Sequence, residues 1–232
     1  MHRVLGVHPR IGCDRLALIR FSYVGFDTAL HDDGEIVVMD AAARQVRRIF
    51  ETLRNMRFPI AKARLLNIYN GDDDASMADN NTSAFNDRPI SPGGTISLHA
   101  YGLAIDVNPV QNPVVERSGA RLTFRPAEGV KFANRSNDRP GKDFRSGMTE
   151  MIIDVFADNG FLIWGGYWDE PIDYQHFQVG RKTAEHLASV SPTEAAEIFD
   201  RMVASYHACR RSLMRKGESS RTPCLSTADL SP

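Results

Sequence analysis

Cysteines are few in this chain of 232 residues, and long apolar runs are absent. The three cysteines, Cys13, Cys209 and Cys224, are scattered and form no CxxC pair, which excludes a thiolate metal site and a disulfide framework. We therefore expect unpaired thiols. The apolar runs, such as residues 161–164, are too short to span a membrane.

A secretory signal and an excess of one charge are also lacking. Residues 1–7 contain no apolar core of a signal peptide, so either the protein acts where it is made or after release by lysis, or an export segment is missing. Lys and Arg number 28 and Asp and Glu number 29, which gives a net charge of −1. Because phosphate binding needs a clustered basic excess, we expect no nucleic-acid partner.

The length suits one well-packed domain, which we place at residues 1–209 and expect to be a monomer. Its core is expected at about residues 12–180, followed by a helix over 191–209 that opens with a capping box at Ser191. Residues 210–232 are polar and poor in apolar side chains, so a disordered tail is predicted.

Runs rich in β-formers predict strands, and apolar residues at helical spacing predict helices. The predicted strands are residues 16–24, 35–39, 63–68, 103–107, 121–124, 161–164 and 177–179, with a turn at 31–34, and the predicted helices follow caps at Asp40, Ser146 and Ser191. Residues 71–81 are expected to form a surface loop. Strands and helices do not alternate strictly, which favours an α+β domain with a mainly antiparallel sheet.

Two segments offer metal ligands. His99 and Asp106 lie seven residues apart, and His176 follows some seventy residues later with Asp173 beside it. Two imidazoles, one carboxylate and an open position are what a catalytic zinc ion needs. On a continuous strand His99 and Asp106 would face opposite ways, so we expect the chain to turn at Gly102.

Hydrolysis also needs a base and a stabilising positive charge. Asp173, expected in a turn after Pro171, is the candidate acid/base because it is not needed as a ligand. Arg88, eleven residues before His99, is a candidate to stabilise the oxyanion. On spacing alone, a surface salt bridge explains Arg88 equally well.

Four motifs together resemble one enzyme family. They are residues 82–88 (TSAFNDR), 97–109 (SLHAYGLAIDVNP), 164–168 (WGGYW) and 173–177 (DYQHF). Their order, over roughly residues 12–180, is similar to that of the D-alanyl-D-alanine carboxypeptidase / L-alanyl-D-glutamate endopeptidase family of zinc peptidases, with the closest likeness to the endopeptidase branch of cell-wall enzymes and phage endolysins.

The resemblance implies a fold and a set of roles. The fold would be the small α+β domain shared with lysostaphin-type peptidases and the hedgehog signalling domain. His99, Asp106 and His176 match the ligands of one zinc ion, Asp173 matches the catalytic acid/base, and Arg88 matches the arginine that orients substrate. The substrate implied is a peptidoglycan stem peptide, cut beside a D-amino acid. Further residues expected around the metal or substrate are Ser97, Tyr101, Trp168 and Gln178.

The chain departs from the family pattern at two positions. Asp87 stands where relatives often have cysteine, and it is a potential partner for Arg88. Gln178 stands where glutamate is common, and it can still hydrogen-bond a metal ligand without the negative charge. Both departures predict slower chemistry or altered specificity.

Three alternatives stay open from the sequence. A D,D-carboxypeptidase or dipeptidase would use the same scaffold, but no residue is identified for binding a free terminal carboxylate. An iron oxygenase also uses two histidines and one carboxylate. A non-catalytic zinc domain that binds wall fragments would need neither Asp173 nor Arg88.

Overall fold

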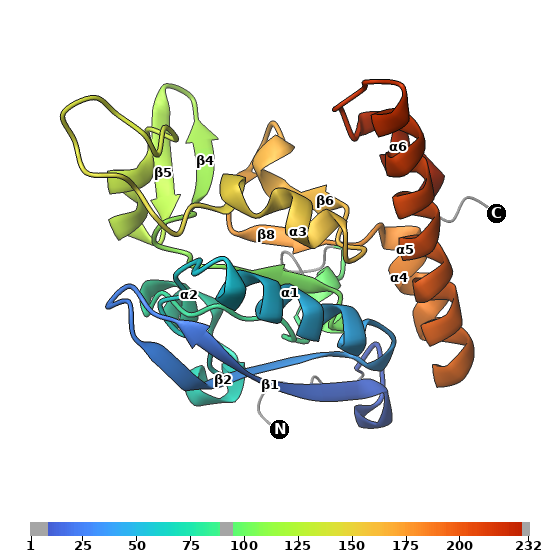
Figure 1. Ribbon diagram of the computed structural model, residues 1–232. Coiled ribbons are helices and arrows are strands. Elements are labelled where there is room, and N and C mark those ends of the chain that lie inside the picture. Colours follow the sequence, from blue (N-terminus) through green and yellow to red (C-terminus); the bar gives the residue numbers. More distant parts are fainter. Residues whose placement is uncertain (1–8, 89–94, 229–232) are drawn as a thin grey trace.

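The computed structural model describes residues 9–88 and 95–228, so residues 1–7, in which no signal peptide was expected, lie outside it. A long antiparallel hairpin opens the described chain: β1 (Leu16–Val24) pairs with β2 (Leu30–Met39), as predicted (Figure 1). The predicted turn at residues 31–34 is wrong. The chain reverses instead where the Gly25 N–H donates to the Ala29 carbonyl, and β2 begins directly afterwards.

Helix α1 (Ala43–Asn55) packs on one face of this hairpin. Its apolar stripe, Val46, Ile49, Phe50 and Leu53, is buried, and the Phe50 ring stacks on Phe21 at 3.8 Å between centroids. Asp40 is the first residue of the preceding 3-10 turn (Asp40–Ala42), and its carboxylate accepts from the neighbouring Ala41 N–H. The predicted helix cap at Asp40 is wrong, because α1 begins after Ala42 and no side chain caps it.

Two small sheets complete the β structure. One has the order β3–β8–β6 and the other β5–β4–β7, and all pairings of named strands in the described residues are antiparallel. The strands are β3 (Ala104–Asp106), β4 (Val114–Ser118), β5 (Arg121–Arg125), β6 (Ile163–Trp164), β7 (Ile172–Asp173) and β8 (His176–Gln178). The predicted α+β class with mainly antiparallel sheets is confirmed.

Several predicted elements differ in kind. Residues 63–68, expected as a strand, make one isolated bridge at Ala63 and then a 3-10 turn (Leu66–Tyr69). The expected loop at 71–81 contains α2 (Asp73–Ala78), because the Asp72 carboxylate accepts from the Ala75 N–H and caps it. The remaining helices before the C-terminal pair are α3 (Ile153–Ala157) and α4 (Arg181–Ser189), and the 3-10 turns are Cys13–Arg15, Leu98–Tyr101, Ala127–Phe132, Thr149–Met151 and Gly165–Tyr167.

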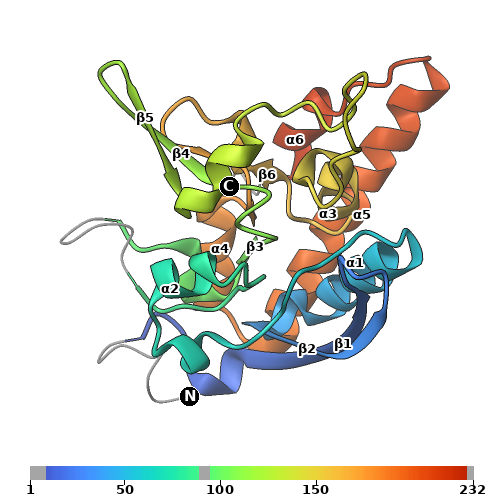
Figure 2. The ribbon, with the colours of Figure 1, turned by 90° about the vertical axis from the view of Figure 1, so that its left-hand side faces the viewer.

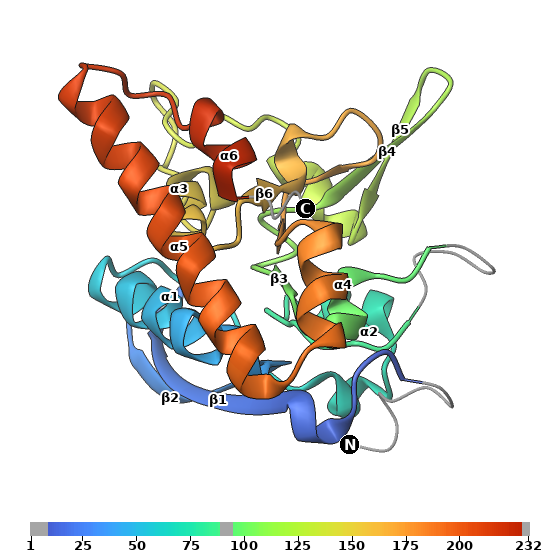
Figure 3. The ribbon, with the colours of Figure 1, turned by 90° about the vertical axis from the view of Figure 1, so that its right-hand side faces the viewer.

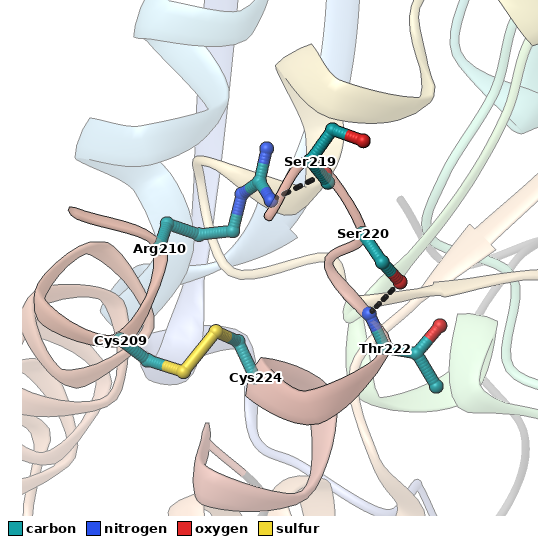
Figure 4. Close-up of a disulfide and its surroundings, with 6 residues drawn as sticks. All are labelled: Cys209, Arg210, Ser219, Ser220, Thr222 and Cys224. Atoms are coloured by element: carbon teal, nitrogen blue, oxygen red, sulfur yellow. Dashed lines mark hydrogen bonds between the residues drawn. A yellow bond between two sulfur atoms is a disulfide. The ribbon is translucent and has the colours of Figure 1, made fainter. Parts of the chain in front are cut away.

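Two helices occupy most of the C-terminal part, which corrects the predicted disordered tail over residues 210–228; residues 229–232 lie outside the described part of the chain. Ser191 caps α5 (Pro192–Arg215) as expected, but the helix continues past residue 209 and is followed by α6 (Thr222–Ala228) (Figure 3). Cys209 and Cys224 form a disulfide between these helices, so the expectation of unpaired thiols holds only for Cys13 (Figure 4). The polar composition of residues 210–232 gave no indication of this disulfide.

The buried apolar side chains form one cluster that extends from Ile11 to Cys224. It includes residues from β1, β2, α1, α3 and α5, so the C-terminal helix belongs to the same core as the hairpin. No helix within residues 9–88 and 95–228 has the length and apolar character needed to cross a membrane. The short sheets β3–β8–β6 and β5–β4–β7 carry the site described next.

Candidate functional site

A left-handed turn at Gly102 positions His99. His99 lies in the 3-10 turn Leu98–Tyr101, where the Ser97 hydroxyl accepts from its N–H at 3.2 Å. Gly102 then takes φ 65°, and a Cβ there would lie 2.6 Å from the Met39 nitrogen, so only glycine fits. The predicted change of direction between His99 and Asp106 occurs at this residue.

The register of β3 and β8 brings the other two candidate ligands together. Asp106 and His176 are directly opposite partners in this antiparallel pair, so their side chains lie on the same face. On its other edge β3 pairs with Ser83, whose N–H and carbonyl bond the Asp106 backbone at 3.0 and 2.8 Å. This bridge also places the Ala84 carbonyl 2.5 Å from His99 Nδ1.

The acceptor atoms of His99, Asp106 and His176 lie close to one another. His176 Nδ1 lies 2.9 Å from one oxygen of Asp106, and His99 Nε2 lies 3.2 Å from the other. The two ring nitrogens, His99 Nε2 and His176 Nδ1, are 3.2 Å apart. All three residues are buried, with exposed fractions of 3–6%.

Hydrogen bonds on the far side of each ring determine which nitrogen carries the proton. His99 Nδ1 must donate to the Ala84 carbonyl, which can only accept. His176 Nε2 donates to the side-chain oxygen of Gln178 at 2.8 Å. In the neutral rings, the nitrogens that face Asp106 therefore carry lone pairs. A cation would satisfy these converging acceptors.

The arrangement fits one divalent ion. Zinc bound tetrahedrally at about 2.0–2.1 Å from nitrogen separates its ligand atoms by about 3.3 Å. The observed separations of 2.9–3.2 Å are close to this value. Each imidazole also has an outer hydrogen-bond partner, as metal-bound histidines usually do. Within the described part of the chain, this is the one group of three such side chains whose ligand atoms all lie within 4.8 Å of one another.

Asp173 lies in the same cleft but comes from the other sheet. It belongs to β7, where it pairs with Val114 of β4, and not to a turn as predicted. A Cβ on Gly165 would lie 2.5 Å from the Asp173 carbonyl, so the first glycine of the 164–168 motif permits this close packing. Asp173 Oδ1 is buried and accepts no hydrogen bond from the described residues. An oxygen in that position is suited to a water molecule or a substrate N–H.

Arg88 also reaches the cleft. Its carbonyl accepts from the Ser97 N–H at 3.2 Å, which holds it beside the turn that carries His99. Its guanidinium pairs with Asp73 at the start of α2, a partner that sequence spacing did not indicate. Two roles were left open for Arg88, a salt bridge and a place in the catalytic site. The structure is compatible with both, since Arg88 makes a salt bridge and also lines the candidate site.

Charges in the cleft shift the pKa values of three groups. Burial and the charge of Asp106 raise the pKa of Asp173 to about 7. Burial acts to lower the pKa of His176, but the hydrogen bond and charge of Asp106 outweigh it and raise the value to about 9. Burial likewise opposes ionisation of Asp106, yet His99 and His176 hold its pKa far below the ordinary range. Asp106 is therefore the permanent anion of the group, and Asp173 is the carboxyl that exchanges a proton near neutrality.

The further predicted residues divide between cleft and core. Ser97, Trp168 and Gln178 line the cleft, and the Trp168 ring lies 5.3 Å from the His176 ring. Gln178 makes the outer-shell bond expected of it. Tyr101 does not belong with them, because its side chain is buried in the apolar cluster.

Sequence reasoning missed several residues of the cleft, which has a volume of about 310 Å³. It lies where β4 and β5, seen above α2 in Figure 2, meet the His99 turn and β8. The bond to His99 uses the backbone carbonyl of Ala84, so the type of its side chain does not indicate this role. Only its place in the motif at residues 82–88 pointed to it. The missed charged residues of the lining are Asp73, Glu116, Arg125 and Arg181.

Comparison with known proteins gives one match. Residues 91–179 match the family model described as D-alanyl-D-alanine carboxypeptidase. The matched segment contains both histidines, Asp106 and Asp173, but neither Arg88 nor Arg181. No curated protein and no solved structure matches the chain. The matched segment covers less than half of the chain, so the match shows a likeness to this family over the residues that carry the candidate ligands and leaves the branch open.

Proposed function

We propose that this chain is a zinc-dependent peptidase that hydrolyses a peptidoglycan stem peptide at an amide bond next to a D-amino acid, with the bond between L-Ala and D-Glu as the first candidate. The observation that carries the proposal is the convergence of three buried acceptor side chains in a cleft that also contains Asp173 and Arg88. A metal site that served only structure would need neither of these two residues.

His99, Asp106 and His176 would hold the zinc ion. When bound, the ion supplies Lewis-acid polarisation of the scissile carbonyl and lowers the pKa of water to about 7. Gln178 and the Ala84 carbonyl keep the two imidazoles oriented through their outer N–H groups. One chain supplies all of these groups.

Asp173 is suited to proton transfer. Its buried Oδ1 has no bond to give up within the described residues, so it is available to take a proton from the attacking water. The same carboxyl then delivers that proton to the leaving nitrogen. Arg88, held by Asp73, presents fixed positive charge in the cleft and stabilises the oxyanion that forms from the substrate carbonyl.

A D,D-carboxypeptidase is the second candidate, and the likeness of residues 91–179 to the D-alanyl-D-alanine carboxypeptidase family favours it. Both activities use the same metal, base and guanidinium. They differ in the residue beyond the cut, which is a terminal D-Ala for the carboxypeptidase and D-Glu for the endopeptidase. In both cases that residue carries its own free α-carboxylate, since D-Glu continues the stem through its side-chain carboxyl.

The disulfide between Cys209 and Cys224 agrees with action at the cell wall. Disulfides persist in oxidising compartments and are reduced in the cytosol of most organisms. We expect the protein to work in such a compartment or after release by lysis.

The test is mass spectrometry of purified muropeptides after digestion, with and without a chelator. Release of L-Ala-terminated glycan fragments identifies the endopeptidase, and loss of terminal D-Ala identifies the carboxypeptidase. Unchanged muropeptides with zinc-loaded protein would refute both activities. Cleavage that survives complete chelation would refute the metal dependence.

The ligand set is tested separately by zinc content. His176→Ala removes one of three protein ligands, so bound zinc measured by elemental analysis should fall well below one ion per chain. His186→Ala is the matched control, because His186 is exposed on α4 and outside the cleft. Full zinc occupancy in His176→Ala would remove that residue from the site.

A further inference from the structure

Three arginines line the cleft, and two of them are already paired with carboxylates of the protein. Arg88 pairs with Asp73. Arg125 lies 3.2 Å from an oxygen of Asp74 and 3.1 Å from one of Glu116. The side chain of the third, Arg181, makes no hydrogen bond or ion pair with any residue of the ranges 9–88 and 95–228. A cleft guanidinium that has no counter-ion among these residues is placed to bind an anion from outside.

Arg181 is held where the two metal-ligand segments meet. It is the first residue of α4 and follows the last residue of β8, Gln178, by only three positions. Helix α4 also packs against the 3-10 turn that carries His99. The side chain is partly buried, so its charge is screened less than that of a fully exposed arginine. The start of α4 has no side-chain cap, which adds a modest preference for negative charge.

The proposed substrates supply a matching anion. In either candidate bond, the residue that leaves carries a free α-carboxylate on the carbon next to the scissile nitrogen. Guanidinium and carboxylate form two parallel charge-assisted hydrogen bonds, which bind and orient the group at once. A carboxamide at the same position lacks the charge and cannot accept both bonds.

We propose that Arg181 binds this α-carboxylate and makes the protein selective for stem peptides in which it is free over those in which it is amidated. The inference rests on the proposed function and specifies its substrate. Arg181 lies outside the segment that matches the carboxypeptidase family, so the proposal concerns a residue that the match does not cover. Its role is substrate binding, separate from the metal and from proton transfer.

The experiment compares two synthetic stem peptides that differ only in a carboxylate or a carboxamide on the residue after the scissile bond. With zinc-loaded protein, Arg181→Gln should raise KM for the carboxylate peptide by about 10- to 100-fold, the range for a hydrogen bond to a charged group, with little change in kcat. The carboxamide peptide should be cut equally by both proteins. Arg181→Lys should restore part of the preference, because it keeps the charge without the planar fork.

Lys182→Gln is the matched control, since Lys182 is the exposed neighbour on α4 and does not line the cleft. It removes the same charge from the same helix turn and should leave KM unchanged. Binding is measured independently by calorimetry in an Asp173→Asn background, where the carboxylate peptide should bind more tightly than the carboxamide and Arg181→Gln should abolish the difference. Zinc content and circular dichroism show that each variant is folded.

Two results would overturn the proposal. One is equal KM and equal affinity of the unsubstituted protein for the two peptides. The other is an unchanged KM in folded Arg181→Gln. Either result can occur while zinc-dependent hydrolysis persists, and the proposed function then stands without it. If neither peptide is hydrolysed, the proposed function fails, and the calorimetric comparison still decides whether Arg181 selects the carboxylate.

Discussion

The cleft around His99 and the C-terminal pair α5–α6 are stabilised in different ways. In the cleft, buried polar atoms converge at 2.9–3.2 Å, and Asp173 Oδ1 accepts no hydrogen bond from the described residues. In the C-terminal pair, an apolar stripe joins the main core and the disulfide connects residues 15 positions apart. The cleft thus brings ligand atoms and an unpaired carboxylate oxygen together, whereas the helix pair is held mainly by apolar packing and a covalent cross-link.

The connection between α5 and α6 also satisfies its polar groups locally. Arg210 donates to the Ser219 carbonyl at 2.8 Å, and the Ser220 hydroxyl accepts from the Thr222 N–H at 3.3 Å (Figure 4). Arg221 donates to the Tyr167 hydroxyl at 2.8 Å. Because functional sites keep groups available for ligands, we expect changes in the cleft to affect activity and changes in the helix pair to affect stability.

The largest expected effect is the loss of activity in Asp173→Asn. The substitution preserves shape but removes the group that accepts and returns the proton, so turnover should fall by about 10²- to 10⁴-fold while zinc content is unchanged. Turnover is measured on purified muropeptides. Asp169→Asn, at an exposed position outside the cleft, is the control. Wild-type turnover in Asp173→Asn would refute the assigned role.

The next effect is expected for Arg88→Ala. Loss of a donor at the developing oxyanion should reduce kcat by about 10²- to 10³-fold, with zinc content retained. Arg47→Ala, on the exposed face of α1, removes the same charge far from the cleft and should keep wild-type kinetics. If the two variants behave alike, Arg88 serves only its salt bridge with Asp73.

Removal of the disulfide should lower stability and leave activity nearly unchanged, the opposite of the two changes in the cleft. Closing a loop of this length stabilises a protein by about 3 kcal/mol, so Cys224→Ser should lower the free energy of unfolding by that order and leave kcat and KM nearly unchanged. Denaturant titration measures the loss. Cys13→Ser is the control, since Cys13 is exposed and free. A large fall in kcat with folded Cys224→Ser would show that the two regions are coupled.

The smallest expected effect is on the pH dependence of stability in chelated protein. The folded pKa of Asp173, about 7, exceeds its ordinary value of 3.8, so the folded state binds more protons and stability falls as pH rises between these values. His176, raised to about 9 from 6.5, contributes stability that is present below 6.5 and lost as pH rises through 9. Both act in the same direction.

Thermal unfolding at pH 5 and pH 8 tests this dependence. The chelated wild-type protein should unfold at a lower temperature at pH 8, and Asp173→Asn should reduce the difference by on the order of a few degrees. Asp169→Asn should keep the full difference. An equal difference in Asp173→Asn and wild type would show that Asp173 ionises normally in the folded protein.

Local patterns predicted several elements of the fold. Periodicity and capping chemistry predicted the strand at Leu16–Val24, the apolar stripe of α1 and the cap at Ser191. Each of these features depends on residues that are close together in the sequence. The turn at 31–34 was placed wrongly because its aspartates and glycine suit a turn, while tertiary pairing with β1 keeps them in the strand. At these residues, pairing within the hairpin outweighs the local turn propensity.

The candidate site was accessible in part for the same reason. His99, Asp106 and His176 stand in short motifs, and Gly102 signalled the change of direction between the first two. Asp173 was identified but placed in a turn, because a strand of two residues has no periodicity to detect. Asp73 and Arg181 escaped notice, since their relation to the cleft depends on how α2 and α4 pack.

The sequence by itself determined which chemistry is available: two imidazoles, an acidic partner, a spare carboxyl and a glycine where the backbone must turn. Only the tertiary structure decided that Asp106 and His176 face each other across β3 and β8, that Asp173 arrives from a different sheet, and that Cys209 meets Cys224. The physical reason is that strand register and helix packing are set by burial of apolar surface over the whole chain, which no local pattern encodes.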